Sequence, residues 1–162
     1  METLQVGTTP LLAILADDHR KAELLDVLRS YCGDLKYMTL LATRDTGNLV
    51  RSRLGMDVAL VQSGSRGGAL QIAALVVEGA VSAVVALHRP SMMPEENVGT
   101  MALRQGCDIH DVPFASNLAT ADAVLAALVR RHSEKRLSGL GNWAEFERTT
   151  AGTTTHSVSR EE

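Results

Sequence analysis

Five short apolar runs alternate with segments of helical periodicity, and this alternation limits the possible folds more than any other feature. The runs span residues 11–16, 37–42, 57–61, 81–87 and 112–115. Strands joined by crossover helices produce this spacing. We therefore predict an α/β fold with a single doubly wound parallel five-stranded sheet and helices on both faces. Ligands bind such sheets outside the carboxyl ends of the strands, where the strand order reverses.

The composition is that of one packed domain and disfavours two classes of partner. Of the 162 residues, 45% are hydrophobic but only 3% are aromatic, and the formal net charge is −3. This charge and the lack of aromatic stacking surfaces predict no nucleic-acid binding. No apolar run is long enough to span a membrane, and the first residues do not resemble a secretory signal. Cys32 and Cys107 lack metal-ligand spacing. We expect a cytoplasmic protein with reduced thiols, no metal and no membrane contact.

We expect three parts along the chain. Residues 1–9 form a loose lead-in, residues 10–132 the folded domain, and residues 133–162 a polar, partly disordered tail. The last helix of the domain is predicted over 119–129. Glycine, serine and threonine dominate much of the tail, which is typical of mobile segments. Trp143 and Phe146 are the tail residues that would dock a short helix onto the domain.

A glycine-rich loop follows the third apolar run. It reads Ser63-Gly64-Ser65-Arg66-Gly67-Gly68 and precedes a helical pattern. Small residues at such a position let backbone N–H groups approach an anion at the start of a helix. Glycine-rich turns also occur simply to connect a strand to a helix. The loop therefore indicates phosphate binding only together with the other loops.

Four segments together resemble methylglyoxal synthase in their order and spacing. They are Asp18-His19-x-Lys21, Ala42-Thr43-x-x-Thr46-Gly47-Asn48-Leu49, Ser63-Gly64-x-x-Gly67-Gly68 and Asn117-Leu118-Ala119-Thr120-Ala121-Asp122. The resemblance extends from about Leu11 to Val129. It implies a doubly wound domain that assembles as a homohexamer. It also implies an enzyme that deprotonates dihydroxyacetone phosphate and eliminates phosphate from the enediolate, without a cofactor.

The resemblance further implies which residues hold the phosphate. These are Lys21, Thr43, Thr46, Ser63 and Gly64. Each residue type suits the role, because an ammonium group supplies a point charge and hydroxyl and backbone N–H groups donate hydrogen bonds.

Three further residues complete the predicted site. Asp18 is the best candidate for an acid or base, although an aspartate before a helix is also a favoured N-cap. His19 matches a position that the family fills with histidine, although a lone histidine at the start of a helix is more often structural. Arg66 lies in the glycine-rich loop, where a guanidinium group suits a phosphate ligand. Asp17 is expected to cap a helix or face solvent, and His88 and His110 are expected to be structural or solvated.

The proton-transfer end of the site departs from the family pattern. The family has an aspartate, its proposed proton abstractor, where this chain has Ala69. Its acidic and histidine-containing segments after the fourth strand correspond here to Arg89-Pro90 and to residues 95–99. Alanine cannot accept a proton, and a general base contributes on the order of 100- to 10,000-fold. Glu95 and Glu96 either supply a displaced base or are acidic residues of the kind commonly found at the N-terminus of a helix, where they interact favourably with its dipole.

Arginines in three loops replace uncharged or acidic family residues. Arg44, Arg66 and Arg89 would favour a ligand more anionic than a triose monophosphate if they line one cleft. If they instead pair with the acidic residues Asp45, Glu95 and Glu96, the cleft stays nearly neutral.

Three functions are compatible with this sequence. We favour a lyase-type enzyme that binds a small phosphorylated metabolite with altered substrate or chemistry. The first alternative is a non-catalytic binding or regulatory module, as in the nucleotide-sensing domain of carbamoyl phosphate synthetase, which shares the fold. The second is an active methylglyoxal synthase that uses a displaced carboxylate.

Overall fold

A computed structural model describes residues 9–89 and 98–151, and it describes side chains as far as residue 138. The chain divides into two units, residues 1–129 and 130–162. The first unit contains a five-stranded parallel sheet with the strand order β3-β2-β1-β4-β5. The strands are β1 (Leu11–Ala16), β2 (Thr39–Thr43), β3 (Ala59–Val61), β4 (Ala83–Leu87) and β5 (Phe114–Ala115). The predicted doubly wound α/β fold is confirmed.

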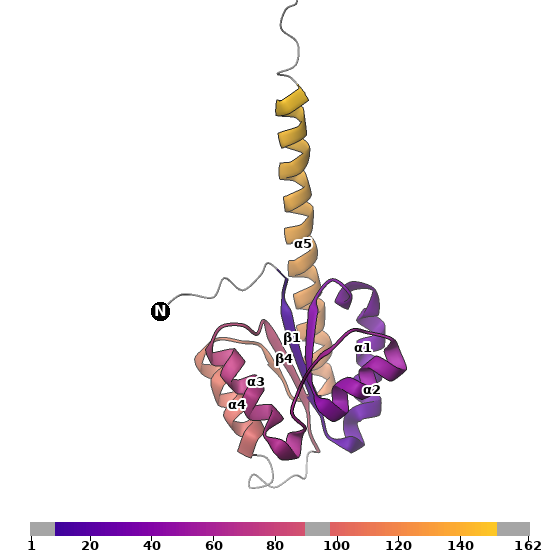
Figure 1. The fold of residues 1–162 in the computed structure, drawn as a ribbon, viewed down its shortest axis with the longest axis vertical. Coiled ribbons are helices and arrows are strands. Elements are labelled where there is room, and N and C mark those ends of the chain that lie inside the picture. Colours follow the sequence, from indigo (N-terminus) through magenta and orange to yellow (C-terminus); the bar gives the residue numbers. More distant parts are fainter. Residues whose placement is uncertain (1–8, 90–97, 152–162) are drawn as a thin grey trace, which may run out of the picture. The chain divides into compact units, whose positions relative to one another are not determined.

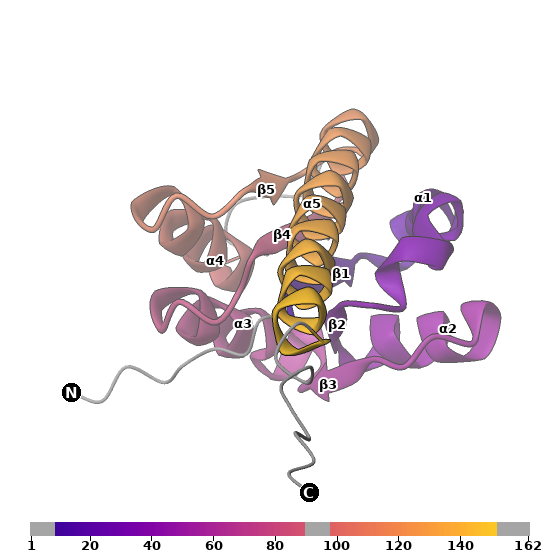
Figure 2. The same cartoon turned by 90° about the horizontal axis from the view of Figure 1, so that it is seen from above.

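Helices cover both faces of this sheet (Figures 1 and 2). The helices are α1 (Lys21–Leu35), α2 (Arg44–Leu54), α3 (Gly68–Val77), α4 (Val98–Ile109) and α5 (Leu118–Ala151), with the short 3-10 turns η1 (Asp18–Arg20) and η2 (Gly64–Arg66). Helices α1, α2 and the beginning of α5 pack on one face, and α3 and α4 pack on the other. The strand order reverses between β1 and β4, which is the place where ligands bind in folds of this kind.

Aliphatic side chains form two cores, one on each face of the sheet. In β1, Leu12 and Ile14 belong to the core beneath α1, whereas Ala13 and Leu15 belong to the core beneath α3 and α4. This division follows from the alternation of side chains along a strand. Because both faces are covered, the strand reads as a continuous apolar run, as parallel strands do.

Neither cysteine forms a disulfide in the structure, and Cys107 is buried in the core beneath α3 and α4. Burial raises the pKa of the Cys107 thiol to about 11. Among the described residues, no helix combines the length and apolarity needed to cross a bilayer.

The last helix is longer than the sequence pattern predicted. The helix predicted over 119–129 begins at Leu118 and continues to Ala151, so that its last part belongs to the second unit. Residues 130–151 contain four arginines, three glutamates, two leucines, two alanines and a lysine, all of which favour helices. The side chains of Trp143 and Phe146 lie outside the described residues, as does the lead-in at 1–8.

We predict that Gly68→Ala destabilises the fold. A Cβ atom at Gly68 would lie 2.0 Å from the carbonyl oxygen of Gln62, so the backbone of the glycine-rich loop must shift. The expected loss in the free energy of unfolding is about 1–3 kcal/mol, the usual cost of overpacking.

Gly33→Ala is the matched control, because its Cβ would meet no atom within 4 Å. This variant should gain about 0.5–1 kcal/mol from the better helix former. Urea denaturation followed by circular dichroism measures both changes. Equal stability of the two variants would contradict the prediction.

Candidate active site

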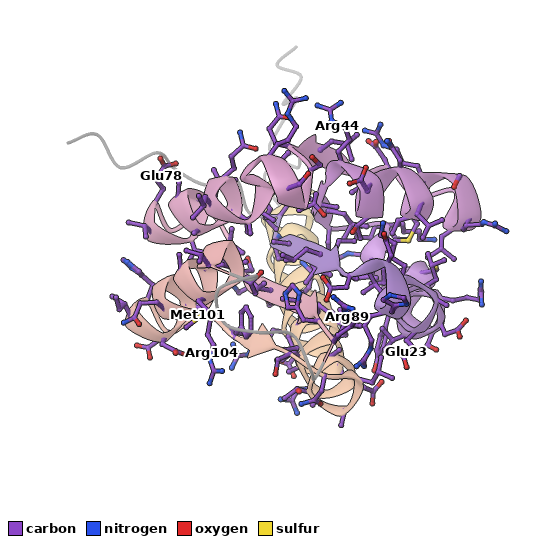
Figure 3. All side chains as sticks on the ribbon, turned by 90° about the horizontal axis from the view of Figure 1, so that it is seen from below. Glu23, Arg44, Glu78, Arg89, Met101 and Arg104 are labelled. Atoms are coloured by element: carbon purple, nitrogen blue, oxygen red, sulfur yellow. The ribbon has the colours of Figure 1, made fainter. Side chains whose placement is uncertain are left out.

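A cavity of about 450 Å³ lies at the carboxyl ends of the central strands, where the strand order reverses. Figure 3 views the molecule from below, with the side chains drawn as sticks. The cavity is lined by Leu15, Ala16, Asp17, Asp18, Lys21, Thr43, Asp45, Thr46, Gly64, Ser65, Ala69, His88, Gly99 and Thr100. Its volume suits a small molecule. The cavity brings together three of the four sequence segments singled out above.

Thr43 and Thr46 join the ends of β1 and β2 at the start of α2. Thr46 is buried, and its Oγ1 lies 3.2 Å from Oγ1 of Thr43 and 3.4 Å from both the carbonyl oxygen and the amide nitrogen of Ala16. Thr43 occupies the N-cap position of α2, but its hydroxyl makes no capping bond. The first amides of a helix lack intrahelical partners and carry a partial positive charge. The Thr43 hydroxyl donates to Oγ1 of Thr46, and the Thr46 hydroxyl donates to the carbonyl oxygen of Ala16. This corner therefore offers the first amides of α2 to an anion, and the hydroxyls would have to turn to donate to it.

Lys21 reaches the cavity from the first turn of α1, with its side chain only 17% exposed. Its Nζ donates to Oδ1 of Asp18 at 2.6 Å, and the Asp18 side chain is 88% exposed. The hydrogen bond and the charge of Lys21 lower the pKa of the Asp18 carboxyl. Asp18 is therefore a weaker base than an ordinary carboxylate, and it acts as the counter-ion of Lys21 rather than as a helix cap.

The glycine-rich loop forms another wall of the cavity through Gly64 and Ser65. Gly67 has a φ of 85°, a left-handed conformation that glycine adopts without strain. Oε1 of Gln71 accepts a hydrogen bond from the backbone N–H of Gln62 at 2.7 Å, which ties α3 to the end of β3. These contacts hold the loop in a compact turn.

The starts of α3 and α4 supply an uncharged wall. Ala69 is 6% exposed, and a Cβ atom built on Gly99 would lie 3.2 Å from the Cβ of Ala69. Thr100 is the neighbouring cavity residue. No side chain of this wall can accept a proton from a ligand carbon.

Asp17 and His88 form a pair that the sequence interpretation missed. Oδ1 of Asp17 lies 3.2 Å from Nδ1 of His88, and Oδ2 accepts the backbone N–H of Arg89 at 2.9 Å. Asp17 occupies the N-cap position of η1, but its side chain makes no capping bond and contacts His88 and Arg89 instead, so the prediction that it caps a helix or faces solvent is wrong. The structural role expected for His88 stays a prediction. Each residue directly follows an apolar run, which was the available signal. Only the strand order reveals that the two runs are neighbours.

Some predicted residues do not line the cavity. His19, Ser63 and Arg66 are absent from its wall, and His19 and Arg66 are exposed. Their contact with a ligand stays a prediction. Arg44 and Arg89 are also exposed and lie well apart in Figure 3.

The arginine hypothesis and its alternative are therefore both unsupported within the described residues. There, Arg44, Arg66 and Arg89 line no common cavity and form no ion pair. Glu95 and Glu96 lie outside the described residues.

The fourth sequence segment supports the fold rather than the cavity. Oδ1 of Asn117 accepts the backbone N–H of Thr120 at 3.0 Å and caps α5. Oδ1 of Asp122 accepts the Tyr31 hydroxyl at 2.6 Å, which fastens the beginning of α5 to α1.

A second cavity, of about 470 Å³, lies at the opposite end of the strands. It is lined by Cys32, Leu35, Lys36, Met38, Thr39, Leu40, Leu54, Gly55, Met56, Asp57 and Ala59. It contains no residue of the four segments, and its position at the amino ends of β2 and β3 is not where such folds bind ligands. In the described part of the chain, no three His, Cys, Asp or Glu residues are grouped to hold a metal ion.

Known proteins identify the family of this chain. It is 39% identical over 123 residues to the methylglyoxal synthase of Cupriavidus taiwanensis, covering 76% of this chain and 92% of that protein. It is 38% identical over 117 residues to the methylglyoxal synthase of Ralstonia nicotianae, covering 72% and 87%. The chain belongs to the methylglyoxal synthase family. The predicted resemblance to this family is thus confirmed.

The fold agrees with a solved structure of the same family. The crystal structure of methylglyoxal synthase from Elizabethkingia anophelis NUHP1 matches with a TM-score of 0.67 and 29% identity, covering 72% of this chain and 77% of that one. No protein-family model matches the chain.

We predict opposite effects of Lys21→Met and Asp18→Asn on the binding of inorganic phosphate. Loss of the Lys21 ammonium should weaken binding about tenfold or more, as expected for a hydrogen bond to a charged group. Loss of the Asp18 carboxylate should strengthen binding several-fold, because it frees Lys21 from its counter-ion.

Isothermal titration calorimetry with inorganic phosphate measures both effects. Lys36→Met is the control, since Lys36 lies over the ring of Tyr37, outside this cavity. If Lys21→Met and Lys36→Met behave alike, the cavity is not the phosphate site.

Proposed function

We propose that this protein is a lyase that binds a small phosphorylated metabolite and eliminates its phosphate. Its substrate or proton-transfer step would differ from that of an ordinary dihydroxyacetone-phosphate phosphate-lyase. One observation carries the proposal: a single cavity combines Lys21, Thr43 and Thr46 with titratable side chains. Ala69 lines the same cavity, at the position where the family resemblance implies a proton abstractor. Membership of the methylglyoxal synthase family supports the lyase class.

The phosphate would bind where Lys21, the start of α2 and the glycine-rich loop converge. The Lys21 ammonium, the hydroxyls of Thr43 and Thr46 and the backbone at Gly64 all line that part of the cavity. Ammonium groups and helix N-terminal amides together favour a dianion. Ser63, His19 and Arg66 would add contacts from the rim of the site.

The elimination needs a base and a stabilised leaving group. A base removes a proton from the carbon beside the carbonyl group, and the electron pair forms an enediolate. The bond between carbon and the phosphate oxygen then breaks, and the phosphate leaves with its electron pair. Lys21 would stabilise the charge that develops on the phosphate. Asp18 was predicted as the acid or base, but its low pKa suits the ionised partner of Lys21 better than proton abstraction.

A non-catalytic binding module is the second candidate. It is favoured by the uncharged wall at Ala69 and Gly99, which retains no carboxylate where the family has one. Such a module would keep the phosphate contacts and lack turnover.

We expect the wild-type protein to release inorganic phosphate from one or more compounds in a panel of phosphorylated hydroxyaldehydes and hydroxyketones that includes dihydroxyacetone phosphate. Lys21→Met should lower kcat/KM at least tenfold, because it removes a charge-assisted contact to the leaving phosphate. A phosphate-release assay with parallel detection of methylglyoxal measures this.

Two results would redirect the proposal. If dihydroxyacetone phosphate is the best substrate and yields equal amounts of methylglyoxal and phosphate, the protein is an ordinary methylglyoxal synthase. If no compound releases phosphate but the esters bind by calorimetry, the protein is a binding module.

We also propose that the protein is a homo-oligomer, with the hexamer of the family as the expected form. Helices α3 and α4 expose apolar side chains, namely Leu70, Val77, Val98, Met101 and Ile109. Monomeric proteins rarely expose many large apolar side chains close together. Burial between subunits would remove this surface from water.

Light scattering coupled to gel filtration should give a mass six times that of one chain. Met101→Glu should shift the protein to a smaller species, because a charge at this exposed position of α4 would be buried at the interface. Arg104→Glu, on the same helix but already charged, is the control. A monomeric wild-type protein would disprove this assembly.

A further inference from the structure

The register between β1 and β4 places Asp17 beside His88. The last pair in the register is Ala16 opposite Leu87. Asp17 directly follows β1 and His88 directly follows β4, so the two residues lie just beyond this last pair. The backbone N–H of Asp17 donates to the carbonyl oxygen of Leu87 at 2.9 Å, which extends the pairing by one step. The two side chains therefore meet at the reversal of strand order.

The contacts of Asp17 determine the protonation of the imidazole. A carboxylate only accepts hydrogen bonds, so Nδ1 of His88, 3.2 Å from Oδ1, must carry the proton. In a neutral imidazole the lone pair then lies on Nε2. The second oxygen of Asp17 is engaged by the backbone N–H of Arg89. Asp17 is thus held in place from both sides and orients His88.

Nε2 of His88 is buried and has no hydrogen-bond partner among the described residues. Buried polar atoms without a partner are uncommon and call for an explanation, such as a ligand. His88 also lines the cavity that contains Lys21 and Ala69. The side chain that carries this unpartnered nitrogen therefore borders the same cavity as Lys21 and Ala69.

The other charged groups of the cavity are less suited to accept a proton. Asp18 is the counter-ion of Lys21, and Asp45 lies in the first turn of α2, beside the threonines. The walls from α3 and α4 contribute only Ala69, Gly99 and Thr100. Asp17 is the only charged side chain in direct contact with His88 among the described residues.

We propose that His88 is the general base of this site and that Asp17 is its positioning residue. The inference rests on the proposed function. The bond between the substrate carbon and its hydrogen breaks, and Nε2 forms the new N–H bond while the electron pair passes to the carbonyl group. The phosphate then leaves with the electron pair of its C–O bond and receives the proton from the imidazolium. The base of this chain would therefore lie at the end of β4, whereas the family resemblance implies a base at the start of α3.

Deuterium exchange at the substrate carbon tests the first step without requiring elimination. Dihydroxyacetone phosphate and the other panel compounds are incubated in D₂O and followed by proton NMR. His88→Gln, which retains a polar side chain without a basic nitrogen, should slow exchange and phosphate release at least 100-fold, the lower end of what a general base contributes. The Kd for inorganic phosphate should change less than about twofold, since phosphate and base contacts come from different elements.

Asp17→Asn tests the positioning role. It should lower kcat with little change in KM, because the amide no longer enforces the Nδ1–H tautomer. Nitrogen-15 NMR of the free protein should show Nδ1–H at His88 in the wild type and a changed tautomer in the variant. His110→Gln is the control, because His110 is exposed at the end of α4 and outside the cavity.

Each result has a distinct meaning. Phosphate release that His88→Gln leaves within about threefold of wild type overturns this inference and retains the proposed function. Exchange that depends on His88 without phosphate release supports the inference and overturns the elimination. Absence of both exchange and release in the wild type overturns both. An Nε2–H tautomer at His88 in the free protein overturns the inference whatever the turnover.

Discussion

The parallel pairing of β1 with β4 is the contact on which the site depends. It lies at the centre of the sheet and is the pair at which the strand order reverses. Because the helices that follow the two strands leave toward opposite faces, their separation opens a crevice at this edge of the sheet. The register then decides which residues border the crevice. A shift by one residue would place Asp17 and His88 out of contact and turn their side chains to the other face.

The two halves of the cavity are formed by different structural elements and different kinds of side chain. The half that we propose to hold phosphate is formed by the ends of β1 and β2 and the start of α2. The buried Thr46 hydroxyl links the two strand ends through its hydrogen bonds with Ala16 and Thr43. The other half consists of a half-buried pair, Asp17 and His88, beside an apolar wall at Ala69. Such a separation would let the chemistry of one half change while an anion site is retained. Under the proposed function, it would allow a family member without a carboxylate on α3 to hold a phosphate ester.

Local patterns in the sequence predicted the strands, the parallel sheet and several residues that lie together in one cavity. Apolar runs and glycine-rich turns are local signals, and the structure places Lys21, Thr43, Thr46 and Gly64 in one cavity. The Asp17–His88 pair could not be predicted, because it depends on which strands are neighbours. The expectation for Asp18 missed the competition from Lys21, a side chain one turn away that draws the carboxylate from a capping role.

Side-chain direction and helix length account for two further differences between the sequence expectations and the structure. The loop position of Arg44, Arg66 and Arg89 suggested a common cleft, but a loop residue can turn to solvent as readily as to a ligand. The continuation of α5 to Ala151 reflects helix propensity that outweighs the glycines at 139 and 141.

The ion pair between Lys21 and Asp18 would make the cavity selective for the charge of an anionic ligand. A singly charged anion that displaces Asp18 only exchanges one carboxylate-strength partner of the ammonium group for another. A doubly charged phosphate ester gains Coulomb energy from the same exchange, and an exposed ion pair costs only about 0–1 kcal/mol to break. Singly charged anions would therefore compete poorly with a doubly charged phosphate ester for Lys21.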